Sequence, residues 1–203
     1  HPFGRLSRSN RPVGVHSLSR LFPRAYSTRV QRLRVPFGFL LAAIFLYLAQ
    51  PTWLSLLLGL PLSAAGLALR SWAAGHLRKD ESLVCSGPYA WTRNPLYLGT
   101  FLTALGCAIA SNEPLVAAAV CALFILIYLP VMEQEEEHLQ YLFPDYTSYA
   151  ARVPLLLPKP PSIKSPLRYQ GELWRRNKEW KAWYGFLAVE VFLLVQVLLS
   201  SGR

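Results

Sequence analysis

Five long runs of apolar residues restrict this chain to one class of fold. A helix that crosses the hydrocarbon core of a bilayer needs about 20 predominantly apolar residues. Few charges interrupt the runs, since 53% of the 203 residues are hydrophobic and 16% are charged. The five candidate spans are residues 35–49, 54–69, 95–111, 115–132 and 182–200. The sequence therefore predicts an all-α, polytopic membrane protein with about five transmembrane helices.

Short linkers group the first four runs into two pairs. Residues 50–53 (QPTW) separate the first run from the second, and residues 112–114 (NEP) separate the third from the fourth. Such linkers leave room only for tight turns, so we expect two helical hairpins followed by a C-terminal span. We divide the chain into a basic arm (1–34), a membrane core (35–154), a Pro-rich basic linker (155–181) and a C-terminal transmembrane helix (182–203).

The basic residues predict the orientation of these spans. Of the 21 Lys and Arg, eight lie in residues 1–34, where there is no acid, and eight lie in residues 152–181. Arg78, Lys79 and Arg93 flank the loop after the first hairpin, whereas both hairpin turns lack basic residues. The positive-inside rule places all three basic regions in the cytoplasm. We therefore attribute the net charge of +10 to membrane topology and expect no nucleic-acid partner, the usual alternative for a basic chain.

Two further features bear on location and metal binding. The Arg- and Ser-rich arm, which lacks acids, suits either a cytoplasmic tail near anionic lipids or an organellar transit peptide; we favour the tail. This places the protein in a bacterial inner membrane, with an organellar membrane as the alternative. Cys85, Cys107 and Cys121 lack metal-ligand spacing, so no metal is expected.

Residues 86–99, SGPYAWTRNPLYLG, form a polar segment between two apolar runs. Its Gly-Pro-Tyr at 87–89 predicts a turn, and its Asn-Pro at 94–95 predicts the start of a helix. The free N–H groups of that helix start, together with Arg93, could hold a carboxylate. The alternative is an ordinary capped helix with interfacial aromatic residues.

A second polar segment, residues 133–137 (EQEEE), follows the fourth apolar run. If the helix continues, Glu133, Glu136 and Glu137 share one face and Glu135 lies on another. Carboxylates at a helix C-terminus oppose the helix dipole, so cations are needed nearby. Arg93 or Arg152 could supply one, or a positively charged ligand such as a sulfonium held by the neighbouring tyrosines. A solvated helix end is the alternative.

Taken together, the two segments resemble the isoprenylcysteine carboxyl methyltransferase family, which is related to the phospholipid N-methyltransferases. The usual signature of that family is G-P-Y, R-H-P-x-Y-x-G, E-E and F-G-x-x-Y-x-x-Y-x-x-R-V-P. The matching positions are Gly87, Pro88, Tyr89, Arg93, Asn94, Pro95, Tyr97, Gly99, Glu135, Glu136, Phe143, Tyr146, Tyr149, Arg152, Val153 and Pro154. The resemblance, over residues 69–154, implies S-adenosylmethionine as cofactor, held between membrane helices and a short cytoplasmic cap.

This resemblance assigns roles to residues of both segments. Those expected to be catalytic are Arg93, Glu135 and Glu136. Those expected to bind the cofactor are Gly87, Pro88, Tyr89, Arg93, Asn94, Pro95, Tyr97, Gly99, Glu135, Glu136, Tyr146 and Tyr149. Arg70, His76 and Arg152 are the candidates for substrate binding; Arg70 is notable because it lies late in an apolar span and should face the bundle.

Two positions depart from the family pattern. Asn94 replaces the His of R-H-P, and an amide cannot take up a proton at neutral pH. Pro144 replaces the Gly that follows the Phe, which affects the local turn rather than the chemistry. A mechanism that needs a base at position 94 is therefore in doubt for this chain.

The resemblance implies methyl transfer to a lipidic or hydrophobic acceptor that enters from the surrounding membrane lipids. We expect a carboxylate acceptor, as in isoprenylcysteine O-methylation. The alternatives are a phospholipid or small-amine N-methyltransferase, and a membrane relative that does not transfer methyl groups, such as a sterol reductase.

Overall fold

The computed structural model describes residues 22–79, 81–161 and 168–201, and all regular secondary structure in these ranges is helical. The first hairpin comprises α1 (Arg24–Leu48) and α2 (Trp53–Ala74), followed by the short 3₁₀-helix η1 (Gly87–Ala90). Next come α3 (Pro95–Ala110), α4 (Pro114–Leu123), the π-helical turn η2 (Phe124–Tyr128) and α5 (Leu129–Leu142). The chain ends with α6 (Tyr146–Ala150), α7 (Gly171–Arg176) and α8 (Trp180–Ser201).

Four of these segments are long and apolar enough to cross a membrane: Ala25–Leu48, Trp53–Ala74, Pro114–Leu142 and Trp180–Ser201. The fifth predicted span is α3, a shorter apolar helix of 16 residues. The predicted all-α polytopic fold is therefore confirmed. The predicted division of the chain stays a prediction, although α1 begins before residue 35 and α8 before residue 182. Residues 1–21 of the basic arm and 162–167 of the linker lie outside the described ranges.

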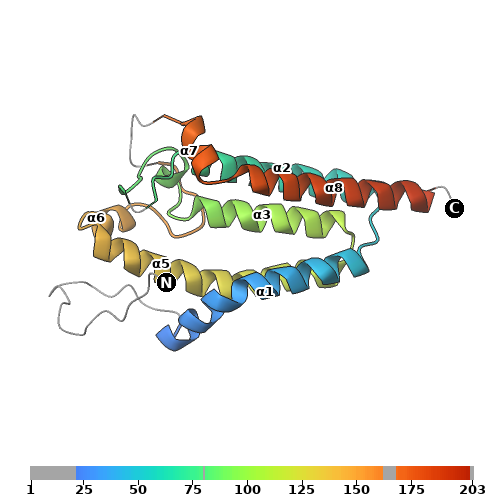
Figure 1. Cartoon of the computed structure of the whole chain (residues 1–203), viewed down its shortest axis with the longest axis horizontal. Coiled ribbons are helices and arrows are strands. Elements are labelled where there is room, and N and C mark those ends of the chain that lie inside the picture. The colour runs from blue at the N-terminus through green and yellow to red at the C-terminus, as the bar shows by residue number, and fades with distance from the viewer. Residues whose placement is uncertain (1–21, 80, 162–167, 202–203) are drawn as a thin grey trace.

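The helices are arranged in two groups that run side by side (Figure 1). Helix α2 packs against α3 and α8, whereas α1 packs against α4, η2 and α5. Helices α1 and α2 of the first hairpin therefore diverge from their turn and pack on different partners, whereas α3 and α4 of the second hairpin contact each other. The two turns meet at one end of the molecule, where the Gln50 backbone N–H donates to the Ser111 carbonyl over 2.9 Å.

Small residues allow α2 and α3 to come into backbone contact. A Cβ atom added at Gly66 would lie 2.4 Å from the backbone nitrogen of Thr103, and one added at Gly106 would lie 2.3 Å from that of Ser63. Packing of this kind suits a membrane, where small residues let helix backbones approach and gain van der Waals contact. The α2–α3 pair therefore forms a rigid centre for the upper group of helices.

A π-helical turn precedes Pro130 in the longest helical segment. Proline has no N–H to donate to the carbonyl four residues earlier, which is that of Leu126. The hydroxyl of Tyr26 on α1 donates to this carbonyl over 2.7 Å instead. An unpaired carbonyl in lipid would be costly, so this bond both compensates for Pro130 and fixes α1 against η2.

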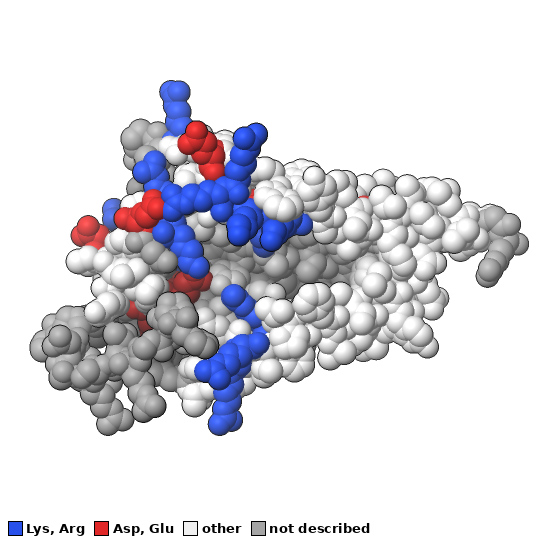
Figure 2. Space-filling view, in the orientation of Figure 1, with Lys and Arg blue, Asp and Glu red and all other residues white. Residues whose placement is uncertain are grey.

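Charged residues gather at one end of the molecule, around α6, α7 and the loop between α2 and α3 (Figure 2). The opposite end, which carries the two tight turns and the end of α8, is almost free of charge in this view. This separation matches the expected distribution of basic residues, and it marks the charged end as the place for a polar site.

We expect Gly106→Ala to destabilise the protein, because the new methyl group would meet the backbone of Ser63. Overpacking of this kind costs about 1–3 kcal/mol, more than the helix propensity that alanine gains. Thermal unfolding of the purified protein in detergent would measure the change. Gly185→Ala is the matched control, since nothing lies within 4 Å of its new Cβ. Equal melting temperatures for the two variants would contradict this account of the α2–α3 contact.

Candidate functional site

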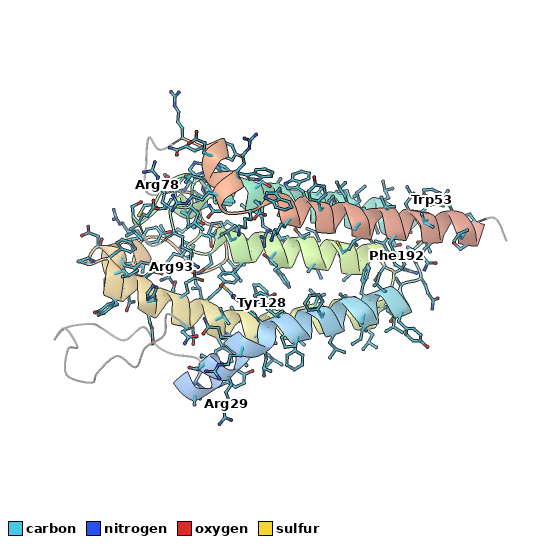
Figure 3. The ribbon with its side chains drawn as sticks, in the orientation of Figure 1. Arg29, Trp53, Arg78, Arg93, Tyr128 and Phe192 are labelled. Carbon is cyan, nitrogen blue, oxygen red and sulfur yellow. The ribbon has the colours of Figure 1, made fainter. Side chains whose placement is uncertain are left out.

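A cavity of about 350 Å³ lies at the charged end of the molecule. Its walls come from the end of α2, the loop that follows, the start of α3, and the α5–α6 region. Nine residues predicted to form the site line it: Arg70, Tyr89, Arg93, Asn94, Pro95, Tyr97, Glu135, Tyr146 and Tyr149. Figure 3 shows Arg78 and Arg93 at this end, and Trp53 and Phe192 toward the other. The two polar segments of the sequence therefore meet around a single cavity of a size that suits a small molecule.

Six predicted site residues do not line the cavity. They are Gly87, Pro88, Gly99, Glu136, His76 and Arg152. Glu136 lies behind Arg93, as described below. Arg152 is exposed and donates to the Ser148 carbonyl. A Cβ atom at Gly99 would lie 2.7 Å from Cγ of Arg70, so this glycine makes room for the arginine.

Gly87 and His76 share a structural contact beside the site. Gly87 has φ of +57°, which favours glycine, and an added Cβ would lie 2.7 Å from Nε2 of His76. The other ring nitrogen of His76, Nδ1, lies 2.9 Å from the Trp72 carbonyl, and the ring packs against Tyr169. The structure thus gives His76 a packing role rather than a place in the cavity wall.

Arg93 and Glu136 form a buried ion pair between the two polar segments. Their Nη1 and Oε1 atoms are 3.0 Å apart, and the side chains are only 11% and 6% exposed. The segment 143–154, which includes α6, is called the cap below. The Arg93 backbone N–H donates to the Pro154 carbonyl at the end of the cap over 2.9 Å. However, Nε and Nη1 of Arg93 and Oε1 of Glu136 make no aligned hydrogen bond. Buried polar groups usually have such partners, so the hydrogen-bonding capacity of this ion pair is only partly used.

Tyrosines supply much of the remaining cavity wall. Tyr97 donates to Oε2 of Glu135 over 2.9 Å, and its ring contacts that of Tyr128. Tyr149 donates to the Tyr89 carbonyl over 2.7 Å, which joins the cap to η1. The Tyr89 hydroxyl, on a residue 8% exposed, has no partner. These contacts hold several aromatic faces and one free hydroxyl around the cavity.

Burial controls the protonation of three of these tyrosines. It raises the pKa of Tyr89, Tyr146 and Tyr149 above the usual range for a phenol. Desolvation has this effect because it disfavours the charged phenolate. The three hydroxyls therefore remain neutral and can donate hydrogen bonds at any physiological pH.

Asn94 is the N-cap residue of α3, but its side chain does not cap the helix. Its Nδ2 donates over 3.1 Å to the Leu155 carbonyl, which also accepts from the Thr92 hydroxyl. The Lys159 N–H donates to the Trp91 carbonyl nearby. The amide thus fastens the chain at Leu155 to the residues just before α3.

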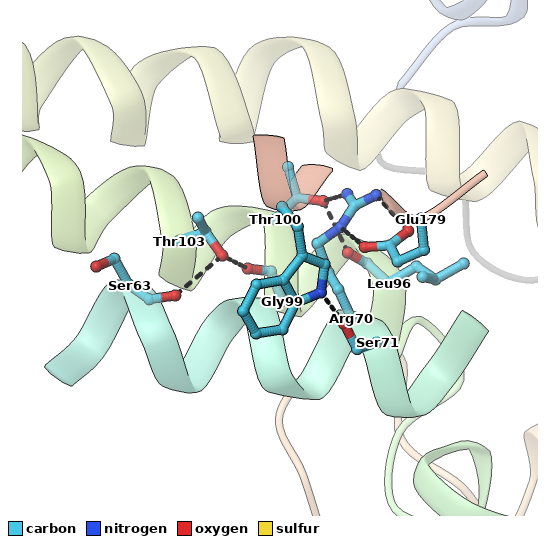
Figure 4. Close-up of polar contacts among 9 residues, drawn as sticks. Ser63, Arg70, Ser71, Leu96, Gly99, Thr100, Thr103 and Glu179 are labelled. Carbon is cyan, nitrogen blue, oxygen red and sulfur yellow. Dashed lines mark hydrogen bonds and ion pairs between the residues drawn. The ribbon is translucent and has the colours of Figure 1, made fainter. Parts of the chain in front are cut away.

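Arg70 enters the cavity wall from the last turn of α2 (Figure 4). Its Nε and Nη2 atoms donate to the two carboxylate oxygens of Glu179 over 2.7 and 3.0 Å, and its Nη1 donates to the Thr100 hydroxyl. Glu179 directly precedes α8 and is 4% exposed. The sequence identified Arg70 but gave no sign of this partner, which lies 109 residues away.

Several lining residues were not predicted from the sequence. The main polar and aromatic ones are Arg78, Lys79, Ser82, Thr100, Tyr128 and Phe143. Thr100 could have been predicted, because it lies three residues after the motif residue Tyr97 and so on the same face of α3. Among the described residues, no three His, Cys, Asp or Glu side chains are grouped so that they could hold a metal ion.

The fold and cavity define a helical protein with membrane-length helices and a small-molecule site at its charged end. The phospholipid methyltransferase family model matches residues 54–146, which include most of this site. The protein-S-isoprenylcysteine O-methyltransferase of Homo sapiens is 33% identical over 133 residues, 59% of this chain and 46% of that protein. The predicted resemblance to the isoprenylcysteine carboxyl methyltransferase family, with its phospholipid methyltransferase relatives, is therefore confirmed.

Two bacterial relatives carry names of a different kind. The cobalt-zinc-cadmium resistance protein CzcN of Cupriavidus metallidurans is 41% identical over 115 residues, 53% of this chain and 52% of that protein. The nickel-cobalt-cadmium resistance protein NccN of Alcaligenes xylosoxydans xylosoxydans is 32% identical over 144 residues, 66% of each chain. The aligned parts thus span between about half and two thirds of the curated relatives. No solved structure matches the chain significantly.

Substitutions at Asn94 would test whether its N–H donor holds the cap. We expect Asn94→Ala to lower the free energy of unfolding by about 1 kcal/mol, the usual worth of one hydrogen bond. Asn94→Asp should cost more, because a carboxylate of the same shape would face the Leu155 carbonyl without a donor. Asn94→His keeps an N–H donor and is the conservative control. Thermal unfolding in detergent measures all three, and an Asp variant as stable as the parent would contradict this role.

Proposed function

We propose that the chain is an integral membrane, S-adenosylmethionine-dependent methyltransferase that acts on a lipidic or hydrophobic acceptor. The observation that carries this proposal is the convergence of Arg93, Tyr97, Glu135, Tyr146 and Tyr149 on one cavity. These residues come from separate parts of the motif by which the sequence resembles the family. By the positive-inside rule, the charged end that holds the cavity faces the cytoplasm.

The cavity offers groups that suit each part of S-adenosylmethionine. The guanidinium of Arg93, which lines the cavity, suits a carboxylate, since arginine binds carboxylates well. The tyrosine faces suit a sulfonium, since aromatic rings attract cations. Glu135, which the Tyr97 hydroxyl orients, suits an ammonium group or ribose hydroxyls. The orphaned hydroxyl of Tyr89 adds a further hydrogen-bonding group. The residues present therefore fit this cofactor.

When bound, S-adenosylmethionine supplies an electrophilic methyl group on its sulfonium. The protein must then align the acceptor with this group and exclude water. In this proposal Glu136 acts on Arg93, which it holds at the cavity wall through the 3.0 Å ion pair. The cap, fastened by Asn94 and Tyr149, supplies one wall of the cavity through Tyr146 and Tyr149. A carboxylate acceptor has no proton to lose, so orientation and desolvation suffice for its methylation.

Binding of S-adenosylmethionine to the purified protein in detergent, measured by calorimetry, is the first test.

The second test is methyl transfer by variants of the site. We expect Arg93→Ala and Glu136→Gln to reduce methyl transfer by about 10²-fold, in the range for loss of one preorganised charged group. Arg175→Ala, at an exposed position on α7, is the control for loss of positive charge. Absence of binding in the parent protein would refute the cofactor assignment. Full activity in both site variants would refute the residue assignment alone.

An amine acceptor is the second candidate, because Glu135 lines the cavity and could accept a proton from an ammonium group. The match to a phospholipid methyltransferase family model also favours it. Carboxyl and amine acceptors give different products: methyl esters release methanol in base, whereas N-methylated lipids retain their label.

Tritiated S-adenosylmethionine, offered with a prenylated cysteine or with phosphatidylethanolamine vesicles, separates these two candidates. We expect base-labile label on the prenylated cysteine. With that acceptor, Glu135→Gln should raise the KM for S-adenosylmethionine but retain transfer at saturating cofactor, because no proton need be removed. Stable label in phosphatidylethanolamine that is lost in Glu135→Gln even at saturating S-adenosylmethionine would establish the amine alternative instead.

A further inference from the structure

Near the end of α2, Arg70 uses only some of its N–H donors on neighbouring residues. The Arg70 side chain lines the cavity and is 26% exposed. Its guanidinium has five N–H donors, of which two go to Glu179 and one to Thr100. Two donors therefore remain for an oxygen atom of a ligand in the cavity.

Glu179 fixes the plane of this guanidinium. The contact is bidentate, which is the most directional pairing available to arginine. Glu179 is 4% exposed, so its carboxylate is shielded from water while the other side of the guanidinium faces the cavity. Without this carboxylate, the long side chain of Arg70 would be free to leave the cavity wall, because Thr100 alone is a single neutral acceptor.

Other contacts fix Glu179 itself against α2. Asn177 donates over 2.8 and 3.1 Å to the carbonyls of Ala74 and Leu77, and so caps the C-terminal end of α2. The indole N–H of Trp183 donates to the Ser71 hydroxyl over 2.8 Å. These bonds lie on either side of Glu179 along the chain. They hold the start of α8 at a defined position on α2, the helix that carries Arg70.

We propose that Glu179 is a positioning residue for the methyl acceptor, acting through Arg70. The start of α8, which lies outside the matched residues 54–146, then completes the site. The two free N–H groups of Arg70 would bind an oxygen of the acceptor, preferably of its carboxylate. This inference rests on the proposed methyltransferase function.

The test uses the full chain in detergent, tritiated S-adenosylmethionine and a prenylated cysteine as the acceptor probe. We expect Glu179→Gln and Arg70→Gln each to raise the KM for the acceptor by about tenfold, the effect of weakening one charged hydrogen bond. The KM for S-adenosylmethionine should stay unchanged. The double variant should be no worse than either single variant, because Glu179 acts only through Arg70.

Glu190→Gln is the matched control, since this acid on α8 accepts a hydrogen bond from Ser63 and neither residue lines the cavity; its KM values should equal those of the parent. If Glu179→Gln does not fold, Glu179→Asp keeps the charge on a shorter side chain and should give an intermediate KM. Labelling of arginines with phenylglyoxal, read by mass spectrometry, should rise at Arg70 in Glu179→Gln and not at Arg93.

An unchanged acceptor KM in Glu179→Gln, or losses that multiply in the double variant, would overturn this inference while leaving the methyltransferase function intact. A parent protein that neither binds S-adenosylmethionine nor transfers methyl groups would overturn the proposed function, and with it the role of Glu179 in acceptor binding.

Discussion

Helices α2 and α3 approach so closely at Gly66 and Gly106 that one added methyl group would meet the backbone of the partner helix. This approach sets the position of the cavity wall. It brings the last turn of α2 beside the first turns of α3, so that Arg70 reaches Thr100 over the space left by Gly99. In a membrane no hydrophobic force draws helices together, and close packing is the main source of their association. The cavity therefore depends on a contact made by residues that do not line it.

Two ion pairs with buried carboxylates hold the charges of the site, and both join segments that are distant in the chain. Arg93 pairs with Glu136, and Arg70 pairs with Glu179. Buried pairs gain little net stability, because desolvation offsets their attraction. Their effect is instead geometric: each fixes a guanidinium at the cavity wall before a ligand arrives. Such preorganisation is worth most in a site shielded from water. Each pair also places arginine N–H donors where an anionic group would bind, while a glutamate balances the charge of the arginine.

The sequence predicts the parts of this structure that follow from local rules. Apolar runs of membrane length give the helices, and a short turn between the third and fourth runs brings the two polar segments together, as the Arg93–Glu136 pair shows. The direction of a side chain is harder to predict from the sequence. His76 and Arg152 are close in the chain to residues that line the cavity, but their side chains contact the carbonyls of Trp72 and Ser148 instead. Glu179 could not be predicted, because its pairing depends on how α8 seats on α2. The close α2–α3 contact was not predicted either, although small residues such as Gly66 and Gly106 are typical of such contacts in membranes.

Position 94 shows how a departure from a family pattern can preserve structure while limiting chemistry. Asn94 donates to the Leu155 carbonyl, a contact that requires only an N–H group. An imidazole could make the same bond, so the chain at Leu155 is fastened equally well by either side chain. The amide, however, cannot accept a proton at neutral pH. Any proton removed from an acceptor in this chain must therefore go to another group, and Glu135 is the carboxylate that lines the cavity. A carboxylate acceptor avoids this requirement altogether, which is a physical reason to favour it where the family's histidine is absent.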